Sequence, residues 1–407
     1  MLSGQLKRSM ITSPPKEKGE TGNELGSTSL RFHRIVFVFA ILFYSITAWF
    51  SVGYHHADEH YQIIEFAGVK NGTNSPEHMP WEFHEKIRPA LQPYIALAVF
   101  SIADGLNFSD PYFKAFLLRL LTGIMAVFIL RHFITAVRGM EEVRHQKWFI
   151  VLSYFLWFLP FIYVRFSAET WSSLLLLFAL SLIIKKGSSA GYHLGIGLLL
   201  GFALVLRSQL VFSVVGLFSW LLLVSKIPLK SLIWIVLGTG VSVFIGVCVD
   251  TVYYGEFTMV PWEYFKANLL DGKAASFGTS PWYTYAHFIF RYAFFPVGSV
   301  ILLAFLTLVV KRPRHVVVWV VVPFLVGHSL IGHKELRFLF PLACLVPWVL
   351  MLAWQEVMDF KGRLKTPLVL RLVVLGWVLV NFTALMVASL QPVGRGRVSI
   401  TEKIHEL

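Results

Sequence analysis

Long apolar runs dominate this chain and recur from Ile35 to Leu390. Most contain roughly 16 to 25 residues, close to the roughly 20 helical residues that cross a lipid bilayer. Hydrophobic residues make up 56% of the 407 residues and charged residues only 14%, whereas soluble domains contain about 25% charged residues. The sequence therefore excludes a soluble enzyme and predicts an all-α membrane protein that crosses the bilayer many times.

Positive charges predict the orientation of the chain. The 36 Lys and Arg outnumber the 23 Asp and Glu, for a net charge of +13. In a membrane protein this excess marks cytoplasmic loops, so no nucleic-acid partner is expected. Placing the basic connections and the amino terminus in the cytoplasm predicts eleven spans. They are residues 35–52, 113–137, 148–164, 168–184, 192–206, 209–224, 231–249, 287–310, 315–331, 338–354 and 369–390.

The segments outside the spans complete the domain plan. We expect a disordered cytoplasmic tail, a transmembrane domain and a polar carboxy-terminal tail, at residues 1–30, 31–391 and 392–407. The apolar residues 89–103 are short for a span and are assigned to an outer loop. The outer loops are residues 54–112, 250–286 and 333–338. Most remaining ionisable residues lie there, so the functional site is expected on the outer face.

The first outer loop opens with a dense group of ionisable residues, His56 to His60. Such density at a membrane boundary costs desolvation and suggests a site, although a hydrated interfacial loop would give the same pattern. Burial beside a lipid-lined cavity would raise the pKa of Asp58 and suit it to take a proton from a sugar hydroxyl. Asp58 is the candidate general base, with Glu59 beside it.

The same residues fit a zinc-binding pattern. His56, Glu59 and His60 match H-x-x-E-H, in which two histidines share a helix face with a catalytic glutamate. A zinc-dependent membrane hydrolase is therefore an alternative, and it needs a third protein ligand. The candidates for that ligand are His78, Glu82 and His84.

A second charged group, His333 to Arg337, separates two apolar runs. Cations at this depth are costly unless they bind something anionic, and a lipid phosphate is the natural ligand. His333, Lys334 and Arg337 could donate to a phosphodiester as its negative charge grows. Arg207 interrupts another apolar stretch and joins these candidates, while Glu335 is a candidate substrate contact. In the structural alternative, Glu335 simply neutralises Lys334 or Arg337.

Aromatic residues interleave with charges in the outer loops. Trp81, Arg88, Tyr254 and Trp282 are candidate substrate contacts, because aromatic faces with polar tips suit both sugars and lipid headgroups. Membrane-interface anchoring explains the same residues equally well. Three further charges, Arg119, Arg165 and Glu169, are interpreted as side chains that snorkel to the interface. The sequence contains no Walker loop, nucleotide-binding glycine motif or paired-cysteine site, so no nucleotide cofactor such as ATP or NAD is expected.

The two charged groups, in this order, resemble motifs of the lipid-linked-sugar mannosyltransferases of glycosyltransferase family 22, which have the GT-C fold. Residues His56 to Gln62 are similar to the family's His-Pro-Asp-Glu-His-aromatic-Gln motif, with Ala57 in place of Pro. Residues His333 to Phe338 match its His-Lys-Glu-x-Arg-Phe signature. The resemblance runs from about residue 50 to about residue 345 and includes Trp81 to Arg88 and Asp250 to Gly255.

The resemblance implies a reaction. Asp58 would be the catalytic base, Glu59 would support it, and His56, His60 and Gln62 would contact substrate. A mannose or related hexose would leave a polyprenyl phosphate, with inversion, for a lipid-linked or glycan acceptor, without a metal. The membrane would be the endoplasmic reticulum or a bacterial inner membrane. A transporter of lipid-linked sugars is a further alternative. The leading hypothesis requires the acidic pair and the later basic group to meet at one apolar cavity.

Overall fold

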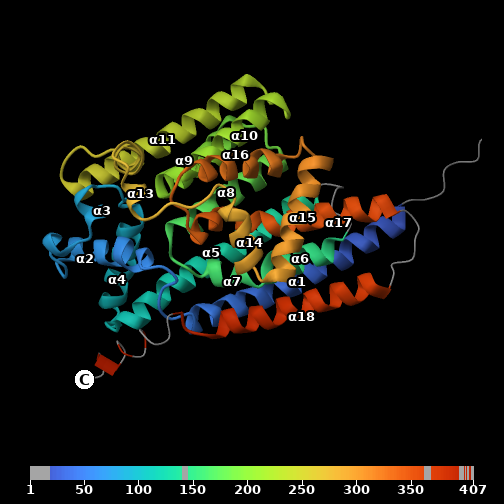
Figure 1. The fold of residues 1–407 in the computed structure, drawn as a ribbon, viewed down its shortest axis with the longest axis horizontal. Coiled ribbons are helices and arrows are strands. Elements are labelled where there is room, and N and C mark those ends of the chain that lie inside the picture. Colours follow the sequence, from blue (N-terminus) through green and yellow to red (C-terminus); the bar gives the residue numbers. More distant parts are fainter. Residues whose placement is uncertain are drawn as a thin grey trace, which may run out of the picture.

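The computed structural model describes residues 19–139, 145–361 and 368–393, together with residues 398, 400, 403 and 404, and this part of the chain consists of helices and connecting loops without a strand (Figure 1). The helices are α1 (Gly19–Phe50), α2 (Glu65–Asn71), α3 (Trp81–His84), α4 (Leu91–Gly105), α5 (Pro111–Arg138), α6 (Gln146–Phe155), α7 (Phe158–Tyr163), α8 (Ala168–Lys185), α9 (Ala190–Leu206), α10 (Val211–Leu223), α11 (Leu229–Tyr254), α12 (Val260–Phe265), α13 (Lys273–Ser276), α14 (Thr284–Tyr292), α15 (Phe295–Lys311), α16 (Val316–Leu330), α17 (Val346–Lys361) and α18 (Leu368–Leu390). Short 3-10 or π segments are η1 (His60–Ile64), η2 (Pro76–His78), η3 (Ser208–Leu210), η4 (Lys266–Leu270) and η5 (Leu336–Leu345).

Six helical segments in the described ranges are long and apolar enough to cross a membrane. They are Leu30–Phe50, Pro111–Arg138, Ala168–Lys185, Leu229–Tyr254, Leu336–Asp359 and Arg371–Leu390. Helices α15 and α16 pass the same test only as a pair, bent by 116°, and α9 and α10 are shorter apolar helices. These segments overlap predicted spans and confirm a polytopic helical membrane protein, while the count of eleven spans stays a prediction.

Prolines break two of the predicted spans. Residues 148–164 form two helices, and the break at Leu156 lies four residues before Pro160. Residues 287–310 likewise divide into α14 and α15, and α14 ends at Tyr292, four residues before Pro296. A proline lacks the N–H that would bond the carbonyl four residues back and clashes with that carbonyl. The apolar pattern predicts the run but does not show where its helix breaks.

The predicted tails fall largely outside the described residues. Residues 1–18 and most of 392–407 are among the positions that the structure leaves undescribed. Helix α1 begins at Gly19, so residues 19–30 are helical where the sequence predicted disorder. Extending an existing helix adds one hydrogen bond for each residue fixed, so a long apolar helix can continue into polar sequence.

The first outer loop is built from short helices at one end of the bundle. Helices α2, α3 and α4 lie together at the left of Figure 1, beside the end of α11. Residues 89–103, which the sequence analysis assigns to an outer loop, lie largely in α4. This helix packs against α2 and α5 and is not among the candidate membrane spans. Asp250 of α11 accepts a hydrogen bond of 2.7 Å from the Ala90 N–H, and Tyr253 stacks on Phe66. These contacts fix the loop on the bundle.

Glycines bring α9 and α11 into close contact. A Cβ atom at Gly197 would lie 2.0 Å from the carbonyl oxygen of Ile235, and one at Gly238 would lie 2.3 Å from that of Leu194. Small residues let helix backbones approach closely in membranes, where apolar side chains alone give little driving force for association. Because α9 ends at Leu206, directly before Arg207, this packing also positions one of the predicted site residues.

We expect Gly197→Val to destabilise the protein, because the added side chain must push α9 and α11 apart. Overpacking of this kind costs about 1–3 kcal/mol or more. Gly240→Val is the matched control, since a Cβ at Gly240 meets nothing within 4 Å. Thermal unfolding in detergent should give a lower Tm for Gly197→Val only. Equal unfolding temperatures for the two variants would contradict close packing at this interface.

Candidate active site

The two charged motifs line one cavity of about 730 Å³ at the first-outer-loop end of the bundle. Its polar lining comes from the segment after α1, the segment before α4, the end of α9 and the segment after α16. The acidic, basic and histidine side chains that line the cavity, some of them from α3, α11 and α16, are His56, Asp58, Glu82, Arg88, Arg207, Asp250, His328, His333, Glu335 and Arg337. Its remaining walls are mainly apolar side chains of α10, α11 and α12.

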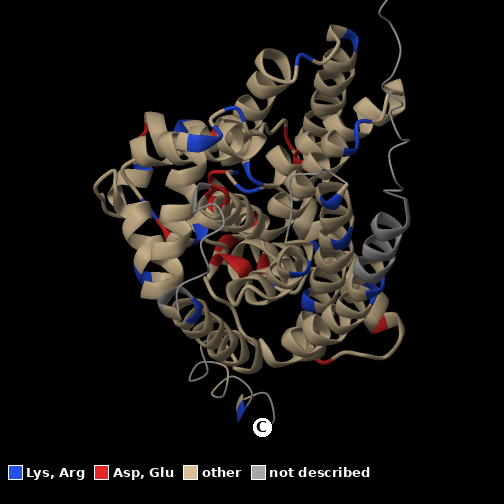
Figure 2. Cartoon of the chain, turned by 90° about the vertical axis from the view of Figure 1, so that its right-hand side faces the viewer, with Lys and Arg blue, Asp and Glu red and all other residues tan. Residues whose placement is uncertain are grey.

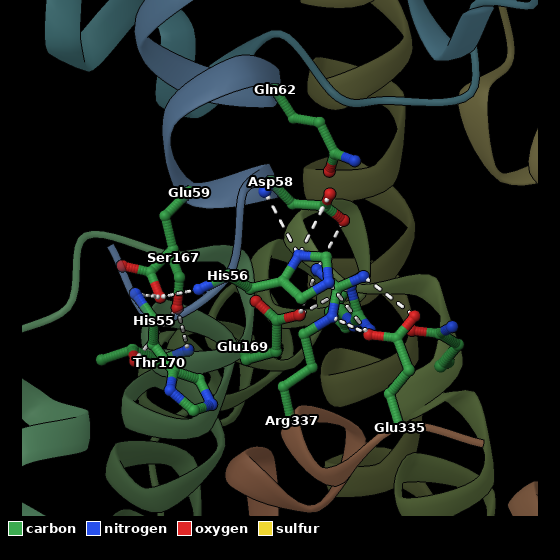
Figure 3. A network of polar contacts seen from close by, with 12 residues as sticks. His55, His56, Asp58, Glu59, Gln62, Ser167, Glu169, Thr170, Glu335 and Arg337 are labelled. Carbon is green, nitrogen blue, oxygen red and sulfur yellow. Dashed lines mark hydrogen bonds and ion pairs between the residues drawn. The ribbon is translucent and has the colours of Figure 1, made fainter. Parts of the chain in front are cut away.

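Asp58 lies at the centre of the charged cluster (Figure 3). Its Oδ2 is 2.5 Å from Nη1 of Arg337 and 3.6 Å from Nη2 of Arg88, and its Oδ1 is 3.2 Å from Nδ1 of His56. The expected meeting of the acidic group after α1 with the basic group after α16 is therefore present in the structure. One carboxylate thus contacts two guanidinium groups from remote segments and the imidazole of its own turn.

The pKa of Asp58 is lowered, not raised as the sequence analysis expected. Burial raises the pKa of this carboxyl, but the hydrogen bond with His56 and the positive charges of Arg337 and Arg88 outweigh that effect. Its pKa therefore lies well below the usual range of an aspartate. The prediction was wrong because it counted burial alone and did not include the guanidinium groups that arrive from remote segments.

Glu59 points away from Asp58 and stabilises the turn that carries it. Its Oε1 accepts the backbone N–H groups of His55 and His56, at 3.2 and 3.4 Å, and its Oε2 lies 3.7 Å from Nη1 of Arg165. Burial raises the pKa of Glu59, against the opposing charge of Arg165. Glu59 thus contacts the backbone of the turn and not the side chain of Asp58.

Arg165 is an internal brace, so its assignment as a snorkelling charge is wrong. The side chain is 1% exposed and donates to the Gly53 carbonyl at 2.8 Å and to the Ser51 hydroxyl. Arg119 is also buried and donates to the Ala48 carbonyl at 2.8 Å. Both guanidinium groups satisfy backbone or side-chain acceptors near the end of α1. Position near the end of an apolar run does not distinguish this role from snorkelling.

Glu335 ties the second motif together. Its Oε2 accepts from Nε of Arg337 at 2.5 Å, its Oε1 lies 2.9 Å from Nε2 of His333, and His56 approaches within 3.5 Å. Burial raises the pKa of Glu335, but its bonds with Arg337 and His333 outweigh this and lower the pKa to about 2. Neutralisation of Arg337 by Glu335, the structural alternative, is therefore present in this structure.

Glu169 and Arg207 add a buried ion pair, in which Arg207 lines the cavity. The Arg207 Nη1 is 3.0 Å from Oε1 of Glu169, and the same oxygen is 3.6 Å from Arg337. Figure 2 shows acidic residues gathered at the centre of the bundle in end view. Glu169 does not snorkel, because the beginning of α8 lies inside the bundle and not at its rim. The sequence analysis did not predict this buried role of Glu169, because the apolar pattern does not show that α8 begins inside the bundle.

Some predicted phosphate and substrate contacts lie elsewhere. The Lys334 ammonium donates to the carbonyls of Ser280, at 2.9 Å, and Ile331, at 2.6 Å, and so fixes the long outer loop. Trp282 is 73% exposed and lines a separate apolar cavity of about 680 Å³. The Tyr254 hydroxyl donates to the Arg88 carbonyl at 2.8 Å, which makes it a support for Arg88.

The remaining predicted contacts divide in the same way. Trp81 lines the cavity and stacks on Phe277, at 5.9 Å between ring centroids. Gln62 donates to Glu82 at 3.3 Å, just outside the main cavity. His60 lies 2.7 Å from Glu65. The structure thus brings Trp81 to the site and gives Gln62 and His60 other partners.

The zinc alternative loses its ligand set in this geometry. It requires His56 and His60 to face one ion, but His56 contacts Asp58 and Glu335, whereas His60 contacts Glu65. Among the described residues no three His, Cys, Asp or Glu side chains form a group that could hold a metal. The arrangement does not favour the hydrolase.

Two tyrosines of the long outer loop and the start of α14 were not predicted as site residues. Tyr264 lines the cavity and accepts a hydrogen bond from Gln209. Tyr285 is 3% exposed, and its hydroxyl has no hydrogen-bond partner in the described part of the chain. Buried hydroxyls normally have partners, so Tyr285 is a candidate contact for a bound ligand. The sequence feature that could have pointed to Tyr285 was its position in a run of aromatic residues in the outer loop.

Comparisons with known proteins agree with this arrangement. The model of the Alg9-like mannosyltransferase family matches residues 35–405. GPI alpha-1,2-mannosyltransferase 3 of Bos taurus is 23% identical over 340 residues, which are 82% of this chain and 60% of that protein. The probable Dol-P-Man:Man(7)GlcNAc(2)-PP-Dol alpha-1,6-mannosyltransferase of Schizosaccharomyces pombe is 28% identical over 171 residues, 42% of this chain and 30% of that protein.

A solved structure shares the fold. ArnT from Cupriavidus metallidurans, bound to undecaprenyl phosphate, matches with a TM-score of 0.51 and 14% identity over 89% of this chain and 64% of that chain. The predicted GT-C fold is confirmed by this match. The chain spans between half and two thirds of the length of the GPI mannosyltransferases it matches. Because the family model covers most of the sequence, the chain belongs to the Alg9-like mannosyltransferase family.

Proposed function

We propose that this protein is a membrane glycosyltransferase that moves a mannose, or a related hexose, from a polyprenyl phosphate to a lipid-linked or glycan acceptor. The observation that carries the proposal is the contact of Asp58 with Arg337 at one end of a largely apolar cavity. A base and a guanidinium group at that point could serve the two ends of a single transfer. The membrane would be the endoplasmic reticulum or a bacterial inner membrane, with the site on its luminal or outer side.

The cavity suits an amphiphilic donor. Apolar side chains such as Phe212, Val247 and Leu269 form one part of the lining, while Arg88, Arg207 and Arg337 face the other part. A polyprenyl chain would lie along the apolar walls, and the phosphate would accept from the guanidinium groups, which bind phosphate bidentately. The relative from S. pombe is named for a Dol-P-Man donor, which supports this donor class.

Asp58 would act as the general base. It would accept the proton of the acceptor hydroxyl while that oxygen attacks the anomeric carbon of the donor sugar from the side opposite the phosphate. The bond from the anomeric carbon to the phosphate oxygen would break, and its electron pair would leave with the polyprenyl phosphate. This single displacement inverts the anomeric centre and uses no metal. His56 and Tyr285 would hold the sugar or the acceptor hydroxyl.

Arg337 would change partners during the reaction. In this structure it binds Asp58 and Glu335 and so lowers the basicity of Asp58. A donor phosphate placed against Arg337 would draw the guanidinium group away from Asp58 and raise the basicity of that carboxylate. The same guanidinium would then stabilise the charge that grows on the leaving phosphate. Donor binding would thus prepare the base.

We expect Asp58→Asn to reduce sugar transfer by about 10²–10⁴-fold, the usual contribution of a general base. The assay is transfer of radiolabelled mannose from dolichyl or undecaprenyl phosphate mannose in membranes, with acceptor lipids supplied. Asp271→Asn is the control, since Asp271 is exposed and lies outside the cavity. Wild-type transfer by an Asp58→Asn protein that is expressed and folded normally would refute the assignment of the base.

We expect Arg337→Gln to lower kcat/KM for the sugar donor by about 10²–10³-fold. Loss of one hydrogen-bonding group that stabilises a developing oxyanion usually has an effect of this size. The substitution should also move the acidic limb of the pH profile upward, because removing the cation raises the pKa of Asp58. The measurement is kcat/KM against pH for both proteins, with Arg291→Gln as a control for an arginine outside the cavity. A loss of rate with an unshifted limb would argue against coupling between Arg337 and Asp58.

A further inference from the structure

A second large cavity lies at the opposite end of the helices from Asp58. Its volume is about 1410 Å³, and it lies between the connections α8–α9, α10–α11 and α15–α16. Helix α8 begins beside Glu169 and ends at Lys185, and its 18 residues span about 27 Å at 1.5 Å per residue. This is the end that the sequence analysis predicts to face the cytoplasm. The donor and acceptor of the proposed reaction are assigned to the other end.

The lining of this cavity carries only positive formal charges. Its charged residues are Lys185, Lys186, Lys226, Lys311, Arg312 and Arg314, and no Asp or Glu is among the described residues that line it. Arg312 pairs with Glu356 outside the cavity at 2.6 Å, and the Lys185 ammonium lies 2.9 Å from a ring nitrogen of His132. The other four cations form no ion pair with any residue in the described ranges. Four like charges around one space favour an anionic occupant.

Two of these lysines occupy backbone positions that favour glycine. Lys186 has φ of 55° and Lys226 has φ of 52°, both in the left-handed region. Lys186 follows the last residue of α8, the position at which a glycine usually ends a helix. A side chain retained in such a conformation suggests a function for that side chain. Both lysines face the same cavity, from different helix connections.

The cavity also has a substantial apolar wall. Ile196, Leu221 and Ile235 are buried there, and Tyr192 and Trp220 lie among the cations. The Trp220 indole N–H donates to the Arg314 carbonyl at 2.8 Å, which fixes the ring beside that basic residue. Aromatic rings and cations together are typical of the depth of lipid headgroups. An occupant of this cavity should therefore combine a negative headgroup with acyl chains.

We propose that this basic cavity binds the headgroup of an anionic phospholipid from the leaflet opposite the active site. The lipid phosphate would accept from Lys186, Lys226 and Arg314, and its acyl chains would lie along the apolar wall. Basic pockets between transmembrane helices at the cytoplasmic side are suited to such headgroups. Orientation of the chain in the membrane requires only that positive charges lie in these loops, not that they surround a common cavity. The proposal does not depend on the proposed sugar transfer.

The test uses the purified full-length protein in detergent, titrated with phosphatidylglycerol or with phosphatidylcholine and followed by native mass spectrometry. The triple variant Lys186→Gln, Lys226→Gln, Arg314→Gln should raise the apparent Kd for phosphatidylglycerol on the order of 100-fold, because each lost cation should weaken binding about fivefold. The matched triple variant Arg34→Gln, Lys147→Gln, Lys230→Gln removes three exposed charges from the same end but outside the cavity. It should keep the wild-type Kd.

Each remaining outcome would overturn the proposal. Equal loss of binding in both triple variants would mean that general charge attraction, not the cavity, holds the lipid. Equal affinity of the wild-type protein for phosphatidylcholine would remove the requirement for an anion. Displacement of phosphatidylglycerol by inorganic phosphate at similar concentration would indicate a site for a soluble anion.

Thermal unfolding of all three proteins checks that the variants retain their fold. If the triple cavity variant is partly unfolded, Lys186→Gln alone takes its place.

Discussion

The ion pair between Asp58 and Arg337 is the contact on which the site depends. It joins the turn after α1 to the segment after α16, and Arg337 extends the network to Glu169 and Glu335. Removing one partner from a buried ion pair leaves an uncompensated charge, which is far more costly than replacing both partners. Each cation here contacts at least one carboxylate, so the network holds remote segments together without a covalent link. Packing of the apolar helices brings these segments to the same end of the bundle, and the ion pairs fix how the segments lie against one another.

This arrangement also explains how a strongly acidic carboxyl can be the base of the proposed reaction. In the resting structure the charges around Asp58 keep its pKa low, so it is ionised and shielded. When the proposed donor reacts, the leaving phosphate gains a negative charge at the moment when Asp58 loses one by taking up a proton. Arg337, which donor binding would already have drawn toward the phosphate, would then stabilise the charge that appears there. The total charge that the guanidinium groups must balance is then constant, which limits reorganisation in a site of low polarity.

Local sequence predicted the ingredients of the site better than their roles. Apolar runs and basic connections predicted a helical membrane protein, and the motifs around Asp58 and Arg337, with their family resemblance, predicted one shared cavity. The direction of Glu59, the use of Lys334 as a loop brace and the burial of Arg165 depend on partners remote in the sequence. The low pKa of Asp58 has the same origin. Helix breaks near Pro160 and Pro296 were readable in principle, because proline acts on the carbonyl four residues before it.

Helices that run through the bundle carry functional groups at both ends. Helix α8 has Glu169 at its first turn and Lys185 at its last, and α9 begins beside the basic cavity and ends at Leu206, directly before Arg207. Glycines keep the backbones of α9 and α11 in close contact. An amphiphile in the basic cavity would therefore hold together helices that also position Glu169 and Arg207. Since Glu169 contacts both Arg207 and Arg337, the order of the charged network is tied to the packing of these helices along their whole length.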